Sequence, residues 1–198
     1  PINAPLPQSS LDQLFLKARS YNGYLDEPVT EAQIRDLWDL MKMGPTSMNM
    51  LPARMVWLTS EEGKERLAKH AADKNADKIR KAPAAVVIGM DTDFHDHLAQ
   101  FYPYVDGKAR FDGKPDLRRE HAFRNSSLQG AYFIIAARAL GLDTGPMSGF
   151  DNQAVDAEFF ADTPNIKSNF ISTLGYGDPS TIHDRSPRPD FEQFNRIE

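Results

Sequence analysis

The spacing of apolar side chains along the chain predicts five helices. In chain order they cover residues 11–18, 31–43, 61–81, 121–140 and 152–160. The first follows a candidate cap at Ser9 or Ser10, and the second follows Thr30, which with Gln33 three residues later has the spacing of a capping box. The third is expected to turn Leu67, Ala71 and Ala72 inward. The fourth is apolar nearly all round, which is typical of a long helix buried at the centre of a fold.

Three apolar runs predict strands, at residues 55–59, 84–90 and 166–174. The run at 84–90 is almost continuous, which is typical of a strand that is buried on both faces. Residues 1–9 carry three prolines and are expected to form an arm. Residues 91–120 have little periodicity and are expected to form an excursion or lid over a site or a partner. The pattern predicts an α+β fold, with separated strands among helices, in a single domain over residues 1–198.

Composition narrows the class of protein. The 198 residues are 40% hydrophobic and 26% charged, which suits one domain with a proper core. A net charge of −5 argues against nucleic-acid binding, and the absence of cysteine excludes disulfides and thiolate chemistry. No apolar run reaches the ~18 residues of a membrane span and no secretory signal is apparent, so no membrane partner is expected and a cytoplasmic location is the default expectation.

The connection between the second helix and the first strand, residues 44–54, is longer and more polar than a simple link requires. It offers the hydroxyls of Thr46 and Ser47, the amide of Asn49 and several backbone N–H groups between Pro45 and Pro52. These groups are suited to hydrogen-bonding a planar polar ligand. A proline-stopped helix exit explains the same composition.

Five polar clusters are spread along the chain. They are Arg19/Ser20/Asn22, Ser47/Asn49, Asn75/Lys78, Pro146–Gly149 and Arg185/Arg188. Arginines suit a phosphate, whereas amides, hydroxyls and glycine-bounded backbone suit a heterocycle, and together they are the inventory that an FMN site needs. Capped loops and a solvated Pro-Arg-Pro tail are the simpler explanation of each cluster taken alone.

Other chemistry has little support in the sequence. There is no G-x-G-x-x-G, Walker loop or nucleophile elbow. The segment Asp91-x-Asp93-x-His95-Asp96-His97 contains potential metal ligands, but i, i+2 spacing alone is weak evidence, and we expect a solvated acidic loop and no metal site there.

Several motifs, in this order and spacing, resemble the FMN-dependent nitroreductase family over essentially the whole chain, and within it the branch of the malonic semialdehyde reductase of pyrimidine catabolism. They are A-R-S-Y-N at 18–22, G-P-T-S-M-N at 44–49, P-A-R at 52–54, N-A-D-K at 75–78, A-A-R-A-L-G-L-D-T-G-P-M-S-G-F at 136–150, L-G-Y-G at 174–177 and the closing Arg-Pro.

The resemblance implies an α+β sandwich, with a central antiparallel or mixed sheet flanked by helices, that forms a homodimer with FMN at the subunit interface. The phosphate and ribityl chain would be held by Arg19, Ser20, Asn22, Arg188 and Arg185. Asn75 and Lys78 would contact the flavin ring edge, and Pro146, Met147, Ser148 and Gly149 one ring face. Pro45, Thr46, Ser47 and Asn49 would come from the partner subunit. Asn22 and Ser148 depart from the Arg or Lys and the Glu of many members, so flavin affinity and potential are expected to differ.

The function that the resemblance implies is NADH- or NADPH-driven reduction of a small acceptor by ping-pong hydride transfer through flavin N5. The acceptor would be a 3-oxo acid of the malonic semialdehyde type, a nitroaromatic or a quinone, and no catalytic side chain is required. Candidate cations for steering a carboxylate are Arg110, Arg118 and Arg124. Two alternatives remain: a flavin-binding carrier or redox sensor without turnover, and a flavin-free helical interaction protein.

Overall fold

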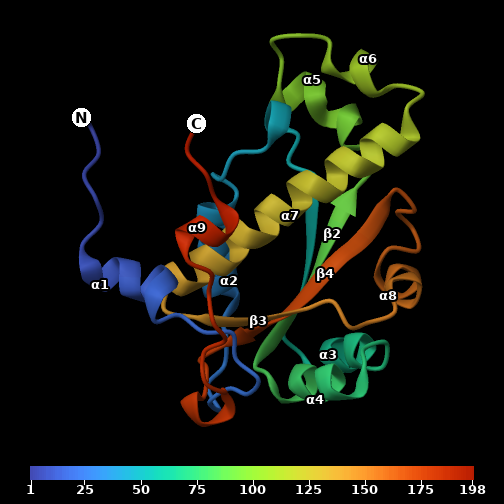
Figure 1. The fold of residues 1–198 in the computed structure, drawn as a ribbon. Coiled ribbons are helices and arrows are strands. Elements are labelled where there is room, and N and C mark those ends of the chain that lie inside the picture. The colour runs from blue at the N-terminus through green and yellow to red at the C-terminus, as the bar shows by residue number, and fades with distance from the viewer.

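The computed structural model describes residues 1–198, and a four-stranded sheet lies at its centre (Figure 1). The strand order is β1-β2-β4-β3 and every neighbouring pair is antiparallel. The strands are β1 (Ala53–Leu58), β2 (Ala84–Asp91), β3 (Asp143–Met147) and β4 (Ile166–Gly175). The predicted α+β class is therefore confirmed, with a sheet that is wholly antiparallel.

Helices cover both faces of the sheet. The helices are α1 (Gln8–Leu11), α2 (Glu31–Met41), α3 (Glu61–Ala68), α4 (Asp73–Lys81), α5 (Leu98–Phe101), α6 (Gly107–Phe111), α7 (Pro115–Ala139), α8 (Asn152–Phe159) and α9 (Phe191–Phe194). Helices α2 and α7 pack on one face, and α3, α4 and α8 on the other (Figure 1). No helix is long and apolar enough to cross a membrane.

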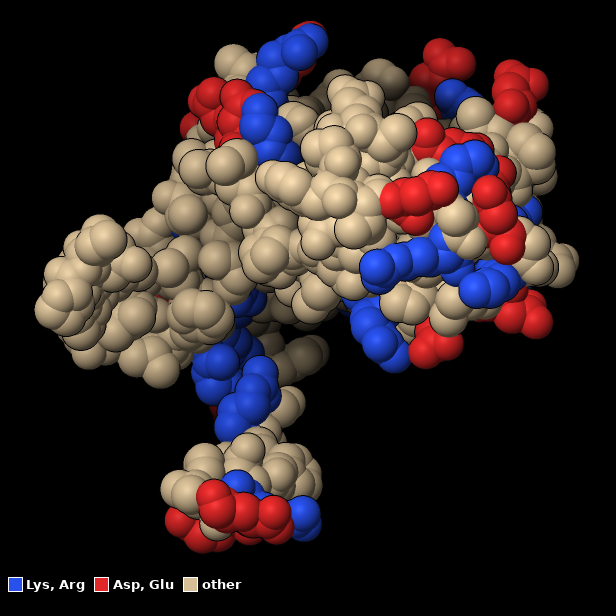
Figure 2. All heavy atoms as spheres, turned by 90° about the horizontal axis from the view of Figure 1, so that it is seen from above, with Lys and Arg blue, Asp and Glu red and all other residues tan.

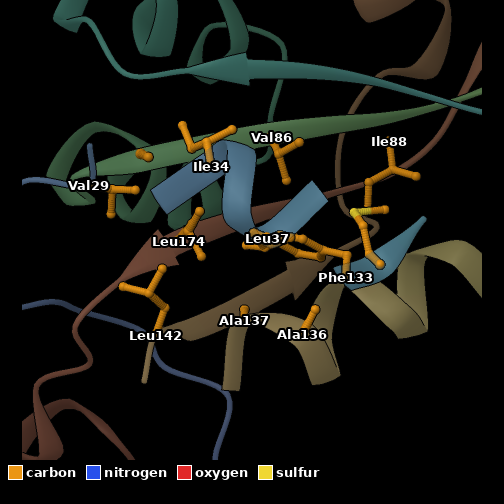
Figure 3. Close-up of a cluster of buried hydrophobic side chains, with 12 residues drawn as sticks. Val29, Ile34, Leu37, Val86, Ile88, Phe133, Ala136, Ala137, Leu142 and Leu174 are labelled. Atoms are coloured by element: carbon orange, nitrogen blue, oxygen red, sulfur yellow. The ribbon is translucent and has the colours of Figure 1, made fainter. Parts of the chain in front are cut away.

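Strand β2 divides the core between these two faces. All eight of its residues are buried. Val86 and Ile88 point toward α2 and α7 (Figure 3). Ala85 and Val87 belong to the core of the opposite layer, as the two-residue period of a strand requires. The prediction of a strand buried on both faces is confirmed.

The long helix α7 differs from the predicted helix in length and polarity. It begins at Pro115, six residues earlier than expected, because proline is favoured in the first helical turn. It is not apolar all round: Asn125, Ser126 and Gln129 are buried, while Phe123 is 55% exposed and Leu128 42% exposed. The helix therefore presents part of its apolar surface outward in the single protomer.

The single helix predicted over 61–81 is two helices, α3 and α4. The chain leaves the helical path at Ala71, which forms a backbone bridge with Phe150, and Ala72 N donates to Gly149 O at 3.0 Å. Leu67 is buried as predicted, but Ala72 is exposed. Tertiary backbone pairing has overridden a helical pattern that has no glycine or proline to mark the break.

Two further predictions are wrong in detail. The first helix starts after Pro7 rather than at a serine cap and continues as a π-helical turn over Asp12–Leu16, so its bonds do not follow the predicted α-helix. Residues 143–147, which lie outside the three predicted strands, form the edge strand β3, with Pro146 opposite Ser172. Proline is tolerated there because an edge strand has one unpaired side.

Residues 91–120 are more ordered than their composition indicates. They contain a 3-10 turn over Phe94–His97 and the short helices α5 and α6, which share a small core with Met50, Met90 and Ala122. This unit stands at the amino-terminal end of α7, at the top of Figure 1. Residues 1–9, by contrast, form the expected arm, since all nine are exposed.

Candidate functional site

The structure gathers the first and last predicted clusters around one cavity of about 650 Å³, which we call the arginine pocket. Its polar lining includes Arg19, Ser20, Asn22, Arg138, Arg185 and Arg188. In Figure 2, blue side chains gather where the charged carboxy-terminal tail joins the body, beside the nearly uncharged amino-terminal arm. Segments that are some 165 residues apart in sequence thus meet at one site, as Arg19 donating to His183 O illustrates.

Backbone pairing to the edge strand positions the amino-terminal half of this pocket. Tyr21 N donates to Thr144 O at 3.0 Å, and Ser20 forms a parallel bridge with Thr144. Asn22 Nδ2 donates to Thr181 O at 2.9 Å, and Arg185 Nη2 donates to Ala18 O at 2.7 Å. Residues 19–22 are therefore hydrogen-bonded both to β3 and to the carboxy-terminal segment of the chain.

The cations of the pocket have no anionic partners. None of the four arginines forms an ion pair with a carboxylate, and Asp184 is the one acidic residue in the lining. Guanidinium groups bind phosphate and carboxylate through charge-assisted hydrogen bonds. Four guanidiniums without carboxylate partners around one cavity are chemically suited to a phosphate-sized anion.

Arg138 is a member of this pocket that the sequence interpretation missed. It donates from Nη1 to Leu14 O at 3.0 Å, and its buried Nε has no hydrogen-bond partner. Burial lowers the pKa of the Arg138 guanidinium, since a charged group loses solvation there. The sequence feature that could have identified Arg138 is that it is the single charged residue in the apolar run 131–140.

A second site element joins α4 to the end of β3. Asn75 Nδ2 donates to Gly149 O at 3.0 Å. A Cβ at Gly149 would lie 2.6 Å from that amide nitrogen, so glycine is needed here for close approach. Lys78, one turn further along α4, is half-buried and takes part in none of the ion pairs of the chain. The structure thus brings Asn75 of one predicted cluster into contact with Gly149 of another.

Strand β3 connects the two site elements. Its Thr144 contacts Ser20 in the arginine pocket, and the chain then runs through Pro146 and Met147 to the Asn75 contact at Gly149. Five residues of extended chain span about 16 Å. An elongated ligand with an anionic end and a planar polar end can contact both elements.

The connection 44–54 has a strained backbone. Met48, Asn49 and Leu51 have φ values of 50°, 47° and 44°, which non-glycine residues adopt at a cost. Such strain persists where the surrounding structure holds it in place, and it clusters at functional sites.

Three polar side chains on one face of α7 hold this strained loop in place. They belong to residues 125, 129 and 132, which are three or four residues apart and therefore share a face of the helix, and we call them the polar stripe. Asn125 Oδ1 accepts from Ser47 N at 2.8 Å, Gln129 Oε1 accepts from Ala53 N at 2.8 Å, and Tyr132 donates to Pro45 O at 2.7 Å. The polar residues that interrupt the apolar pattern of α7 therefore fix the shape of this loop. The sequence interpretation missed them because it counted α7 as core.

Replacing Asn125 with leucine is expected to release the loop. The change removes the acceptor for Ser47 N and the Asn125 donor to His121 O, so we expect a loss of about 1–3 kcal/mol in the free energy of unfolding. Amide hydrogen exchange should accelerate at residues 45–51. The matched change Asn195→Leu in the exposed tail should alter stability by no more than about 0.5 kcal/mol. Unchanged exchange in the loop would show that the α7 stripe does not hold it.

Within one protomer, the loop is separate from the arginine pocket. Pro45 and Asn49 line a different cavity of about 850 Å³, which we call the loop pocket and which shares no lining residue with the arginine pocket. Thr46 and Ser47 belong to the same loop but line neither cavity. Two of the five predicted clusters, Arg19/Ser20/Asn22 and Arg185/Arg188, meet at the arginine pocket, and Asn75 contacts Gly149. Ser47/Asn49 joins neither group in this chain.

The candidate metal ligands serve other purposes. No group of three or more His, Cys, Asp or Glu residues is placed to hold a metal ion. Asp91 is buried and accepts from Arg54 Nη2 and Asn165 Nδ2, each at 2.8 Å. His95 Nε2 lies 3.3 Å from Asp112 Oδ1. The segment predicted to be a solvated acidic loop is thus partly buried and internally hydrogen-bonded.

Comparison with known proteins identifies the class. The model of the nitroreductase family matches residues 16–176, and the chain belongs to this family. A protein of Burkholderia lata, provisionally named NADH dehydrogenase/NAD(P)H nitroreductase, is 53% identical over 193 residues, which are 98% of each chain.

Solved structures share the fold. A nitroreductase-type protein from Bacillus subtilis superposes with a TM-score of 0.87 at 21% identity, covering 97% of this chain and 100% of that one. A protein from Exiguobacterium sibiricum, solved in complex with FMN, gives a TM-score of 0.81 at 18% identity over 99% of both chains. The predicted family and fold are therefore confirmed.

Proposed function

We propose that this protein is an FMN-dependent NAD(P)H oxidoreductase. The observation that carries the proposal is the arginine pocket, in which four guanidiniums without carboxylate partners surround a cavity at one end of β3, with Asn75 and Lys78 at the other. The relatives support it: their names specify NAD(P)H nitroreductases, and a structural neighbour contains FMN. Bound FMN would supply two-electron transfer between the nicotinamide and an acceptor.

The residues have distinct roles in this proposal. Arg19, Arg185 and Arg188 bind the phosphate, and Ser20 and Asn22 orient the ribityl chain. Asn75 and Lys78 contact the ring edge, and Pro146, Met147, Ser148 and Gly149 lie along one ring face. Arg138 adds positive charge beneath the phosphate. No catalytic side chain is assigned, since the protein supplies position and charge.

We further propose that the active form is a homodimer with FMN at the interface, in which Pro45, Thr46, Ser47 and Asn49 complete the partner's site. Pro45, Ser47 and Asn49 are exposed, and Ser47 has no side-chain hydrogen bond within the chain. Large apolar side chains are also exposed on the arm, on α7 and on the tail, including Leu6, Phe123 and Phe194. Exposed apolar surface on this scale is typical of an interaction face.

The acceptor in this proposal is a 3-oxo acid of the malonic semialdehyde type, a nitroaromatic or a quinone. The test is an absorbance spectrum of the purified protein before and after anaerobic addition of NADH or NADPH. Flavin bands near ~450 nm that bleach rapidly, and return when an acceptor is added, support the oxidoreductase. Bands that persist with both nicotinamides indicate a carrier or sensor instead, and a colourless protein that FMN cannot reconstitute would overturn the flavin proposal.

Lys78→Met is expected to lower the midpoint potential of bound FMN. A cation at the ring edge favours the reduced, more negative flavin, so its loss should shift the potential by on the order of tens of millivolts. Lys74→Met, an exposed lysine on the same helix, is the matched control and should leave the potential unchanged. The potentials are measured by spectroelectrochemical titration. Equal potentials in both variants would show that Lys78 does not lie at the ring edge.

A further inference from the structure

The loop pocket has a composition unlike that of the arginine pocket. It encloses about 850 Å³ and its lining includes six hydrophobic residues, among them Trp38, Met43 and Phe101. Three basic residues, Lys42, Arg54 and His97, also line it, and no acidic residue does. Pockets of ~300–1,000 Å³ with apolar walls and a few placed polar groups are typical of small-molecule sites.

Two of the three basic groups, Arg54 and His97, lie against one buried carboxylate, whereas Lys42 Nζ lies 2.5 Å from Oδ1 of the exposed Asp39. Asp91 Oδ2 accepts from Arg54 Nη2 at 2.8 Å and lies 3.8 Å from His97 Nε2, while its own side chain is 4% exposed. Asp91 also accepts from Asp93 N and Asn165 Nδ2, so its charge is satisfied away from the cavity. The side chains of Arg54 and His97 are 32% and 50% exposed and line the pocket, and Arg54 Nη1 also donates to Leu51 O and Ala53 O.

We infer that the loop pocket binds the acceptor, and that it selects acceptors with a ring-sized apolar body and a carboxylate. The apolar wall contacts the ring-sized body of the acceptor. Its carboxylate binds at the part of the pocket that is lined by Lys42, Arg54 and His97. A three-carbon 3-oxo acid would leave most of the cavity unfilled. This inference rests on the proposed function, because the pocket adjoins the flavin only if Pro45 and Asn49 contact the partner's FMN.

None of the other three candidate cations for this role lines the loop pocket. Arg118 donates to Thr92 O and Phe111 O, and Arg124 pairs with Glu120 at 3.0 Å. Arg110 is exposed and does not line the loop pocket.

The test compares a carboxylate with its neutral isostere. Calorimetric titration of the holoprotein with 4-chlorobenzoate and 4-chlorobenzamide measures binding without turnover. Turnover is then measured with 4-nitrobenzoate and 4-nitrobenzamide, whose nitro group takes two electrons and two protons from NADPH and H⁺ to give the nitroso compound and water. We expect the carboxylates to bind at least about fivefold more tightly and to have the higher kcat/KM.

The double variant Lys42→Gln/His97→Gln should remove this preference, because the affinity of each carboxylate should fall to that of its amide. It avoids Arg54, whose loss would leave the buried Asp91 without its cation. Arg110→Gln, outside the pocket, should retain the preference. Equal affinity for acid and amide in the wild-type protein, or a preference that survives in the double variant, would overturn the inference. Failure of NADPH to reduce the flavin would instead refute the proposed function. The calorimetric measurement does not depend on that reduction, so the two failures can be distinguished.

Discussion

The double variant Arg19→Gln/Arg185→Gln is expected to bind FMN at least about a hundredfold more weakly than the wild-type protein. Each charge-assisted hydrogen bond to a phosphate contributes about 1.5–3 kcal/mol, and the loss of two corresponds to ~3 kcal/mol or more. Fluorescence titration of the apoprotein with FMN gives the dissociation constant directly.

Riboflavin is the matched ligand for this experiment, because it lacks the phosphate. Its affinity should be nearly the same in the wild-type and double-variant proteins. The variant Arg35→Gln, which changes an exposed arginine that pairs with Glu31 on α2, should bind both ligands normally. A parallel loss of riboflavin binding would mean that Arg19 and Arg185 support the fold, through their bonds to His183 O and Ala18 O, rather than the phosphate.

Two phenylalanines on α7 are expected to give opposite results when each is replaced by alanine. Phe133 is fully buried and packs against Trp57 with ring centroids 5.8 Å apart. Its removal leaves a cavity between α7 and the sheet, and we expect a loss of about 3–5 kcal/mol in the free energy of unfolding, measured by urea denaturation.

Phe123 is exposed in the protomer, so Phe123→Ala should change the stability of the protomer itself by no more than about 0.5 kcal/mol. If the outward face of α7 lies in the dimer, the same change should raise the dimer dissociation constant roughly tenfold, measured by sedimentation. An unchanged dissociation constant would exclude this face from the interface.

The elements that the sequence predicted well are those whose pattern is local. Strand β2 is recognisable because burial on both faces demands an unbroken apolar run. The capping box at Thr30 and Gln33 forms as predicted, since it depends on four adjacent residues. The arginine clusters were predicted from residue type, and the fold brings them together around one cavity.

The features that were missed depend on contacts between distant segments. The break at Ala71 exists because residues 70–72 pair with residues 149–151. The polar stripe Asn125, Gln129 and Tyr132 could not be distinguished from a surface face without the loop that it holds. Arg138 has a role only when the carboxy-terminal tail crosses its helix.

The central claim is that each FMN site combines the arginine pocket of one protomer with the loop of its partner. The most direct test is complementation between two defective variants. Arg19→Gln/Arg185→Gln removes the phosphate cations, and Ser47→Trp fills the space that the loop would offer to the partner's flavin.

The two variants, with different affinity tags, are co-expressed and the heterodimer is isolated for FMN analysis. Each homodimer should be nearly free of FMN, whereas the heterodimer should hold one FMN per dimer that NADPH reduces, because one of its two sites is intact. A heterodimer as empty as the homodimers would contradict the account, since it would mean that both elements serve a site within a single chain.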